Sequence, residues 1–141
     1  MNSLQITQEN DASKNDRAIV LNGLRAYNRQ HSSAPNWLPL TLLARDLEGT
    51  VRGGLLGETG WNWLYVEILW IDEAYRGQGY GSVLLAAAEK EAQNRGCSSV
   101  YLDTFDFQAL PFYQQQGYSV FGVLEDYPPG SRRSFLQKRL R

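Results

Sequence analysis

The chain has 141 residues, of which 43% are hydrophobic and 21% charged, and this length and balance predict one compact domain over residues 1–141. Fourteen lysines and arginines against fifteen aspartates and glutamates give a net charge of -1, which argues against a general nucleic-acid-binding role. One cysteine and one histidine exclude an internal disulfide and an ordinary zinc site.

The first residues do not have the basic and apolar segments of a secretory signal peptide. Residues 1–16 are polar, and no apolar run reaches the roughly 18 residues needed to span a bilayer, so we expect a cytoplasmic protein without membrane contacts. Charge is spread unevenly, because residues 53–75 and 96–131 contain no lysine or arginine. These acidic stretches favour a cationic over an acidic partner.

The first part of the chain predicts one helix and three strands. Alternating apolar and polar residues favour a strand, whereas apolar residues three and four positions apart favour an amphipathic helix. Pro39 precedes the second strand, and Glu48-Gly49 forms the turn between the second and third strands. The predicted elements are a strand over 3–7, a helix from a cap at Asp11 or Ser13 to about Gln30, and strands over 40–45 and 51–58.

The central part predicts a strand, a loop and a helix. Residues 63–72 are rich in aromatic and β-branched side chains and include one charge, Glu67. A loop over 73–81 leads into a helix from about Gly79 to Arg95, after which Gly96 stands where a left-handed residue commonly follows a helix. The residues predicted to face inward from this helix are Val83, Leu84, Ala87, Ala88 and Ala92.

The last part predicts a strand over 98–105, a short helix over 108–116, a strand over 118–124 and a final strand over 133–140. Cys97 is expected to be a small buried residue, and His31 to be a surface or capping residue. The whole order favours a mixed α/β (α+β) domain, with a central sheet of about six to seven strands flanked by helices.

Glycines cluster where the central strand meets its helix, in the segment Arg76-Gly77-Gln78-Gly79-Tyr80-Gly81-Ser82. The unpaired N–H groups at a helix N-terminus converge on an anion, and glycines let a phosphate approach without meeting a Cβ. The first helical turn has no carboxylate, which leaves the positive end of the helix dipole for a ligand. The segment therefore predicts a phosphate-bearing cofactor.

Other interpretations of this glycine loop compete. The Walker pattern is excluded, because no Gly-Lys-Ser or Gly-Lys-Thr follows. A dinucleotide site is favoured by Asp103, which closes the next strand at about the distance of a ribose-binding acid, but Ser82 replaces the third glycine. A glycine-rich turn without a ligand is the remaining alternative.

The segment from Arg76 to Gly81 resembles the Gln/Arg-x-x-Gly-x-Gly/Ala signature of the GNAT superfamily of acyl-CoA-dependent N-acyltransferases. A second match lies downstream, where Ala109 is followed four residues later by Tyr113 and then by Gly117-Tyr118. The resemblance covers essentially the whole chain, and it is strongest from Trp63 to Tyr118.

The resemblance implies a GNAT-like fold with splayed central strands and acetyl-CoA as the cofactor, released as CoA. The pyrophosphate would rest on backbone amides of the glycine loop, and the N–H of Leu69 or Ile71 would bind the thioester carbonyl. Many members have Asn where this chain has Asp106, in a side contact to the cofactor. The implied cofactor-binding residues are Leu69, Trp70, Ile71, Arg76, Gly77, Gln78, Gly79, Tyr80, Gly81, Ser82, Asp106 and Tyr113.

Two residues are candidates for proton transfer. An aliphatic amine has a pKa near 10.4, so a base must take its proton before it attacks. Glu67 matches a Glu used in this way, directly or through water, in some polyamine-acetylating relatives, and a solvated strand carboxylate is the alternative. Tyr113 matches the family's general acid, and an aromatic packed beside Phe112 is the alternative.

Aromatic and acidic residues near the central strand predict the acceptor site. Trp63, Tyr65, Glu67 and Tyr127 are the candidates for binding a cationic amine, and core packing is the alternative for the aromatic rings. Further residues of this kind in the same stretches are Glu58, Trp61, Trp70, Glu125 and Asp126.

The sequence therefore predicts an N-acetyltransferase that moves an acetyl group from acetyl-CoA directly to the amine of a small, cationic molecule. The alternatives are a protein lysine or N-terminal acetyltransferase and a non-catalytic acyl-CoA-binding or sensor module. A homodimer is implied by the resemblance alone.

Overall fold

The computed structural model describes residues 3–141, which fall into two compact units divided between Ala34 and Pro35. Within residues 3–141, no helix is both long enough and apolar enough to cross a membrane. The single domain expected over residues 1–141 stays a prediction.

The first unit contains one helix, α1 (Lys14–His31). The Ser13 side chain caps it by accepting a hydrogen bond of 3.1 Å from the backbone N–H of Asp16, which confirms Ser13 as the cap. The strand predicted over residues 3–7 was wrong. No described strand pairs with this segment, and alternation of side chains alone does not satisfy the backbone groups of a strand.

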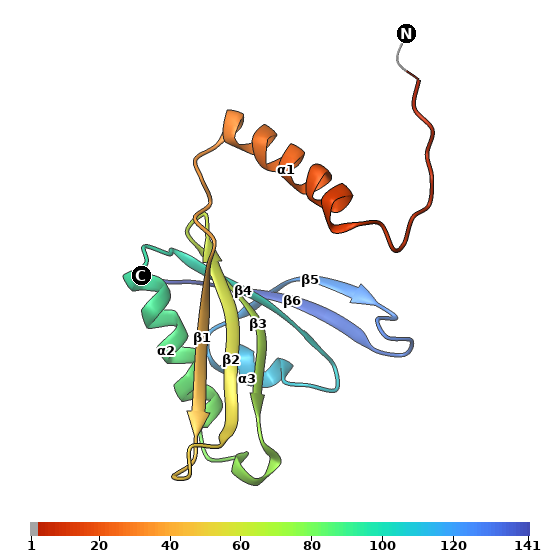
Figure 1. Cartoon of the computed structure of the whole chain (residues 1–141). Coiled ribbons are helices and arrows are strands. Elements are labelled where there is room, and N and C mark those ends of the chain that lie inside the picture. Colours follow the sequence, from red (N-terminus) through yellow and green to blue (C-terminus); the bar gives the residue numbers. More distant parts are fainter. Residues whose placement is uncertain (1–2) are drawn as a thin grey trace. The chain divides into compact units, whose positions relative to one another are not determined.

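The second unit is a six-stranded mixed sheet with two α-helices (Figure 1). Its strands lie in the order β1-β2-β3-β4-β6-β5, and all neighbours are antiparallel except β3 and β4. This confirms the predicted fold class. The elements are β1 (Leu38–Arg45), β2 (Val51–Gly60), β3 (Trp63–Ile71), η1 (Glu73–Tyr75), α2 (Tyr80–Asn94), β4 (Ser99–Phe105), α3 (Leu110–Gln115), β5 (Ser119–Glu125) and β6 (Arg132–Arg139).

Two local predictions need correction. Strand β1 includes Pro39, because it is an edge strand and a proline there removes no hydrogen bond between central strands. Val83 and Ala87 do not face the core of the sheet, and Val83 is 64% exposed. The residues of α2 that are buried are Leu84, Leu85, Ala88 and Ala92, so the apolar stripe of this helix includes Leu85 in place of Val83.

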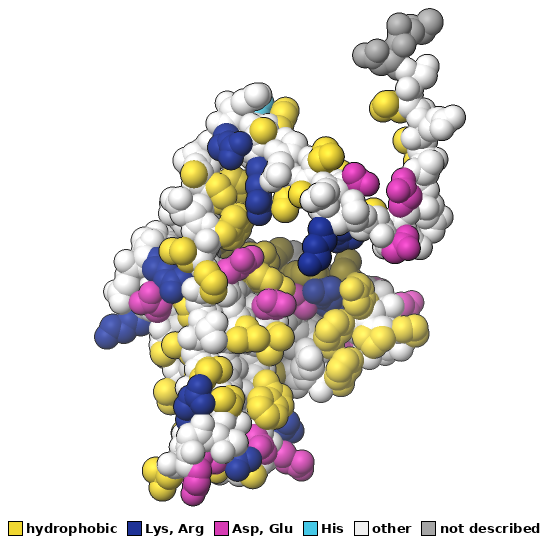
Figure 2. Space-filling view, in the orientation of Figure 1, with side chains coloured by type: hydrophobic (Ala, Val, Ile, Leu, Met, Phe, Trp, Pro, Cys, Tyr) yellow, Lys and Arg dark blue, Asp and Glu magenta, His cyan; other side chains and the backbone are white. Residues whose placement is uncertain are grey.

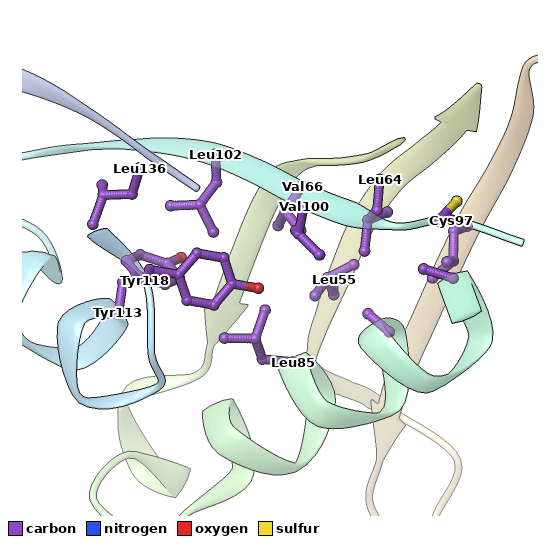
Figure 3. Close-up of a cluster of buried hydrophobic side chains, with 13 residues drawn as sticks. Leu55, Leu64, Val66, Leu85, Cys97, Val100, Leu102, Tyr113, Tyr118 and Leu136 are labelled. Atoms are coloured by element: carbon purple, nitrogen blue, oxygen red, sulfur yellow. The ribbon is translucent and has the colours of Figure 1, made fainter. Parts of the chain in front are cut away.

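The hydrophobic core lies between the sheet and the helices α2 and α3 (Figure 3). Leu55, Val100 and Leu136 from three different strands are completely buried in it. Cys97 is also buried, as predicted, and burial raises the pKa of its thiol. Tyr113 and Tyr118 lie at the opposite end of the core from Cys97 in Figure 3.

The sheet also carries exposed apolar side chains away from this core. Figure 2 shows hydrophobic side chains gathered over the arm formed by β5 and β6. Strand β5 lies at the edge of the sheet and pairs with β6 alone. Its exposed apolar residues are Val120, Phe121, Val123 and Leu124.

The two central strands separate after a short parallel contact. Trp63–Tyr65 of β3 pairs with Ser99–Tyr101 of β4, and no further residues of these strands pair with each other. The rest of β4 continues along β6, and the rest of β3 continues along β2. A gap therefore opens between the strands, and this confirms the predicted splay.

A β-bulge in β3 marks the place where the strands part. Leu56 of β2 pairs with Ile68, but the next residue, Gly57, pairs with Val66. Glu67 is therefore the extra residue on β3. Because a bulge bends its strand and increases the local twist, it turns β3 away from β4 at this point.

The backbones of β2 and β3 approach closely at Gly57, next to the bulge. A Cβ built on Gly57 would lie only 2.4 Å from the carbonyl oxygen of Tyr65, so the backbone would have to move. We expect Gly57→Ala to lower the free energy of unfolding by about 1–3 kcal/mol, measured by urea unfolding. The control is Gly122→Ala, where the added Cβ meets nothing within 4 Å. Equal losses of stability in the two variants would contradict the close approach.

Candidate functional site

A cleft follows the gap between β3 and β4 and continues to the start of α2 and to α3. It consists of two adjoining cavities of about 460 and 510 Å³. The first is lined by the glycine loop, and the second by Glu67, Trp70 and Asp103. The residues that line both cavities are Leu69, Ile71, Arg76, Ala109 and Tyr113. The fold thus brings together the predicted loop, the central strand and the predicted acid.

The glycine loop leaves open space above its backbone. Gly77 and Gly79 have φ values of 75° and 88°, and a Cβ on either residue would meet nothing within 4 Å. Gly79 is the N-cap of α2, and the helix has neither a side-chain cap nor an acidic residue in its first turn. The first N–H groups of α2 are therefore available to an anion.

Two side chains bind this loop to the end of β3 and to η1. The guanidinium Nε of Arg76 donates a hydrogen bond of 2.8 Å to the carbonyl oxygen of Ile71. The side-chain amide of Gln78 donates to the carbonyl oxygen of Ala74. These bonds fix the path of the chain between the end of β3 and the start of α2.

Strand β3 presents part of its backbone to the cleft. The N–H of Asp72 donates a bond of 2.7 Å to the carbonyl oxygen of Arg52 on β2. Because successive N–H groups along a strand point to opposite edges, those of Ile71 and Leu69 point away from β2, toward the gap. This edge is free to pair with an extended ligand, since β4 has already separated from it.

Tyr113 projects from α3 to the meeting point of the two cavities. Its side chain is packed against the rings of Phe112 and Tyr118, at centroid distances of 5.2 and 6.0 Å, and the residue is only 7% exposed. Burial raises the pKa of Tyr113 to about 12, and the charge of Asp103 adds to this effect. The phenol therefore keeps its proton at neutral pH.

A polar network behind Tyr113 was missed by the sequence analysis. The Tyr118 hydroxyl donates to Glu89 of α2 at 2.7 Å, and the Lys138 ammonium donates to the same carboxylate and to the carbonyl oxygen of Gln116. The Gln116 side chain in turn donates to the Ser82 hydroxyl at 3.1 Å. The network ties the end of α3 to both the start and the middle of α2.

Glu67 lies in the bulge and lines the same cavity as Tyr113. It is exposed, so water can reach its carboxylate. Asp103 lines this cavity as well, but Arg133 binds its carboxylate at 2.8 Å. Asp106 lies outside the two cavities and accepts a hydrogen bond of 2.9 Å from the backbone N–H of Arg132. Its carboxylate thus holds the start of β6.

The structure divides the predicted aromatic cluster into separate groups. Trp63 and Tyr65 lie together with Tyr101 of β4, which the sequence analysis did not single out. Tyr127 accepts a hydrogen bond of 3.0 Å from Arg133. Trp61 packs edge-on against the ring of Trp37 at 5.8 Å.

Comparison with known proteins adds to this geometry. Residues 9–118 match the acetyltransferase (GNAT) family. The chain is 45% identical over 93 residues to the blasticidin-S acetyltransferase of Streptomyces morookaense, a match that covers 65% of this chain and 68% of the relative. It is 40% identical over 116 residues to an acetyltransferase of Agrobacterium fabrum, covering 82% of this chain and 85% of the relative.

Solved structures share the fold. An acetyltransferase from Bacillus cereus superposes with a TM-score of 0.88 at 33% identity, over 95% of this chain and 98% of the other. A candidate acetyltransferase from Agrobacterium tumefaciens gives a TM-score of 0.89 at 34% identity, over 97% of this chain and 100% of the other. A candidate streptothricin acetyltransferase from Bacillus anthracis was solved with acetyl coenzyme A. It gives a TM-score of 0.65 at 20% identity, over 82% of this chain and 68% of the other.

The raised pKa of Tyr113 links stability to alkaline pH. Because folding raises this pKa from 10 to about 12, the associated stability is complete below pH 10 and is lost as the pH rises toward 12. We expect the urea midpoint of the protein to fall more steeply between about pH 10 and 12 than that of Tyr113→Phe, which lacks the titrating group. Parallel losses in the two proteins would contradict the burial argument.

Proposed function

The chain belongs to the acetyltransferase (GNAT) family, and on this basis we propose that it acetylates the amine of a small, cationic molecule, taking the acetyl group directly from acetyl-CoA. Family membership gives the enzyme class, an acetyl-CoA-dependent N-acetyltransferase. The observation that carries the proposal is the cleft, in which the glycine loop, the free edge of β3, Glu67 and Tyr113 all line connected space. A relative named for a small antibiotic supports a small acceptor.

The residues of the cleft fit the cofactor. The backbone amides from Gln78 to Ser82 suit the pyrophosphate, because the loop is open at Gly79 and α2 has no side-chain cap, and Arg76 adds positive charge beside them. The free edge of β3 suits the amide groups of the pantetheine arm. When bound, acetyl-CoA supplies an acetyl group activated as a thioester.

Glu67 is proposed as the base. Most of a free amine is protonated at neutral pH and cannot attack, so its proton must first be removed. Glu67 lines the cavity in which the acceptor would meet the thioester. It accepts the proton directly or through a bridging water, because its side chain is open to solvent.

The N–H of Leu69 or Ile71 is proposed to stabilise the negative charge that develops on the thioester oxygen during attack. Both N–H groups point toward the gap, and the bonds of β3 with β2 fix their direction. A donor that is already in position needs no reorganisation at the moment of reaction.

Tyr113 is proposed to donate its proton to the departing sulfur. Its pKa of about 12 keeps the phenol protonated until that step. The same buried surroundings would raise the pKa of the CoA thiol that forms beside Tyr113. The difference in acidity between the phenol and this thiol would then be smaller. Trp63, Tyr65 and Tyr127 are proposed to bind the cationic acceptor, and the homodimer stays a prediction.

Cofactor binding is expected to depend on Gly79. Acetyl-CoA or CoA at 100 times its dissociation constant should stabilise the fold by about 2.7 kcal/mol in a thermal-shift titration, and NAD should give no shift. Gly79→Ala should weaken the binding of CoA about tenfold or more, because the added Cβ occupies the space above the loop.

Gly96→Ala is the matched control, since Gly96 also has a positive φ and open surroundings but follows the other end of α2. It should cost similar stability and leave the affinity for CoA unchanged. An absence of any shift with both CoA species would overturn the assignment of the glycine loop.

The proposed acid and base are expected to affect turnover and not cofactor binding. Glu67→Gln and Tyr113→Phe should each lower kcat by about 100-fold or more, with the thermal shift by acetyl-CoA retained. Release of the CoA thiol measures turnover across the pH range. Full activity of Glu67→Gln at every pH would remove the base from the proposal, and a Tyr113→Phe protein that loses its fold would place Tyr113 in packing alone.

A further inference from the structure

A row of three aromatic rings lies on the face of the sheet opposite to α2 and α3. Leu64 and Val100 face the core, so their neighbours Trp63, Tyr65 and Tyr101 project from the other face. Tyr65 and Tyr101 are stacked at a centroid distance of 4.8 Å and an interplanar angle of 20°. Trp63 meets Tyr101 edge-on at 6.0 Å, and all three residues are partly exposed.

A carboxylate flanks this row on each of two sides. Glu58 of β2 lies directly opposite Tyr65 in the sheet register. Its charge contributes, after burial, to the raised pKa of the Tyr101 hydroxyl. Glu67 follows Tyr65 by two residues along β3 and lies at the mouth of the cleft.

Among the described residues, no lysine or arginine forms an ion pair with either of these two carboxylates. Of the four acidic residues on the strands, Asp103 and Glu125 each pair with an arginine of β6. Within residues 3–141, neither Glu58 nor Glu67 forms an ion pair. Residues 53–75, which include both carboxylates, also contain no lysine or arginine, so a cationic ligand would supply the charge that no described ion pair gives Glu58.

We propose that the space between Glu58 and the Tyr65–Tyr101 pair is a subsite for a second cationic group of the acceptor. The inference rests on the proposed function and narrows its substrate class to diamines and larger oligoamines. Aromatic rings and a carboxylate together attract an ammonium group more strongly than either alone. An uncharged tail of the same length gains neither interaction.

The positions of Tyr65 and Glu67 along β3 also give the distance expected between the two nitrogens of the acceptor. Two residues of a regular strand span about 7 Å, and the bulge at Glu67 makes this the upper limit of its separation from Tyr65, so a spacer of about five carbon atoms is long enough to join the two nitrogens. The acceptor would lie along β3, with its reacting amine at the cleft and its second ammonium beside Glu58.

The test compares 1,5-diaminopentane with 1-aminopentane, which share the reacting amine and the chain length. We expect kcat/KM to favour the diamine by about tenfold, well above the factor of two that its second reactive amine gives. Glu58→Gln and Tyr101→Leu should each bring this preference to near twofold, whereas Tyr101→Phe should keep it because the ring remains. Glu48→Gln, in the turn between β1 and β2, is the charge-matched control and should also keep the preference.

Isothermal titration of 1,5-diaminopentane into the CoA-bound protein separates the two proposals. Diamine binding that Glu58→Gln weakens, in a protein that acetylates no amine, would overturn the proposed function and support the subsite. Acetylation of both amines within a factor of two would overturn the subsite and leave the proposed function standing. A preference that survives Glu58→Gln would likewise overturn it.

Discussion

Parallel pairing between β3 and β4 stops after three residues of each strand, and the site is built around this interruption. Every backbone N–H and C=O removed from a ladder needs another partner. On the β4 side the partner is β6, which takes over pairing along the rest of the strand. On the β3 side an edge is left unpaired beside the cavities, and it can be completed by an extended ligand that carries amide groups of its own.

The bulge that turns β3 away also determines what its side chains face. Leu64 and Val66 before the bulge are buried, whereas Glu67 and Ile68 at the bulge are exposed. A regular strand would bury every second residue along its whole length. One extra residue therefore moves a carboxylate to the mouth of the cleft without placing it in the core, where an unpaired charge would be costly.

Helices α2 and α3 are held against each other on the other side of the cleft. A Cβ on Gly81 would already lie 3.3 Å from the ring of Phe112, so the two helices approach closely next to the glycine loop. The hydrogen bond from Gln116 to Ser82 and the Glu89 carboxylate, which is shared by Tyr118 and Lys138, keep this arrangement in place. The loop that suits an anion and the phenol of Tyr113 are thus positioned by one set of contacts, which limits the motion of either.

Sequence alone predicted the parts of this design that are local. The glycine loop, the strand before it and α2 have strong periodicity and turn chemistry, so they were found with bounds close to those of the structure. The strand over 3–7 failed because pairing is not encoded within one segment, and for the same reason Tyr101, Arg133 and Lys138 were not assigned to any site. Arg133 binds Asp103, which lies 30 residues away, and Lys138 binds Glu89, which lies 49 residues away. No local pattern in the sequence indicates partners at such separations. The net charge of -1 likewise does not show which carboxylates are paired. In the fold, Arg133 neutralises Asp103, whereas Glu58 and Glu67 have no ion pair in the described part of the chain and lie beside a row of aromatic rings.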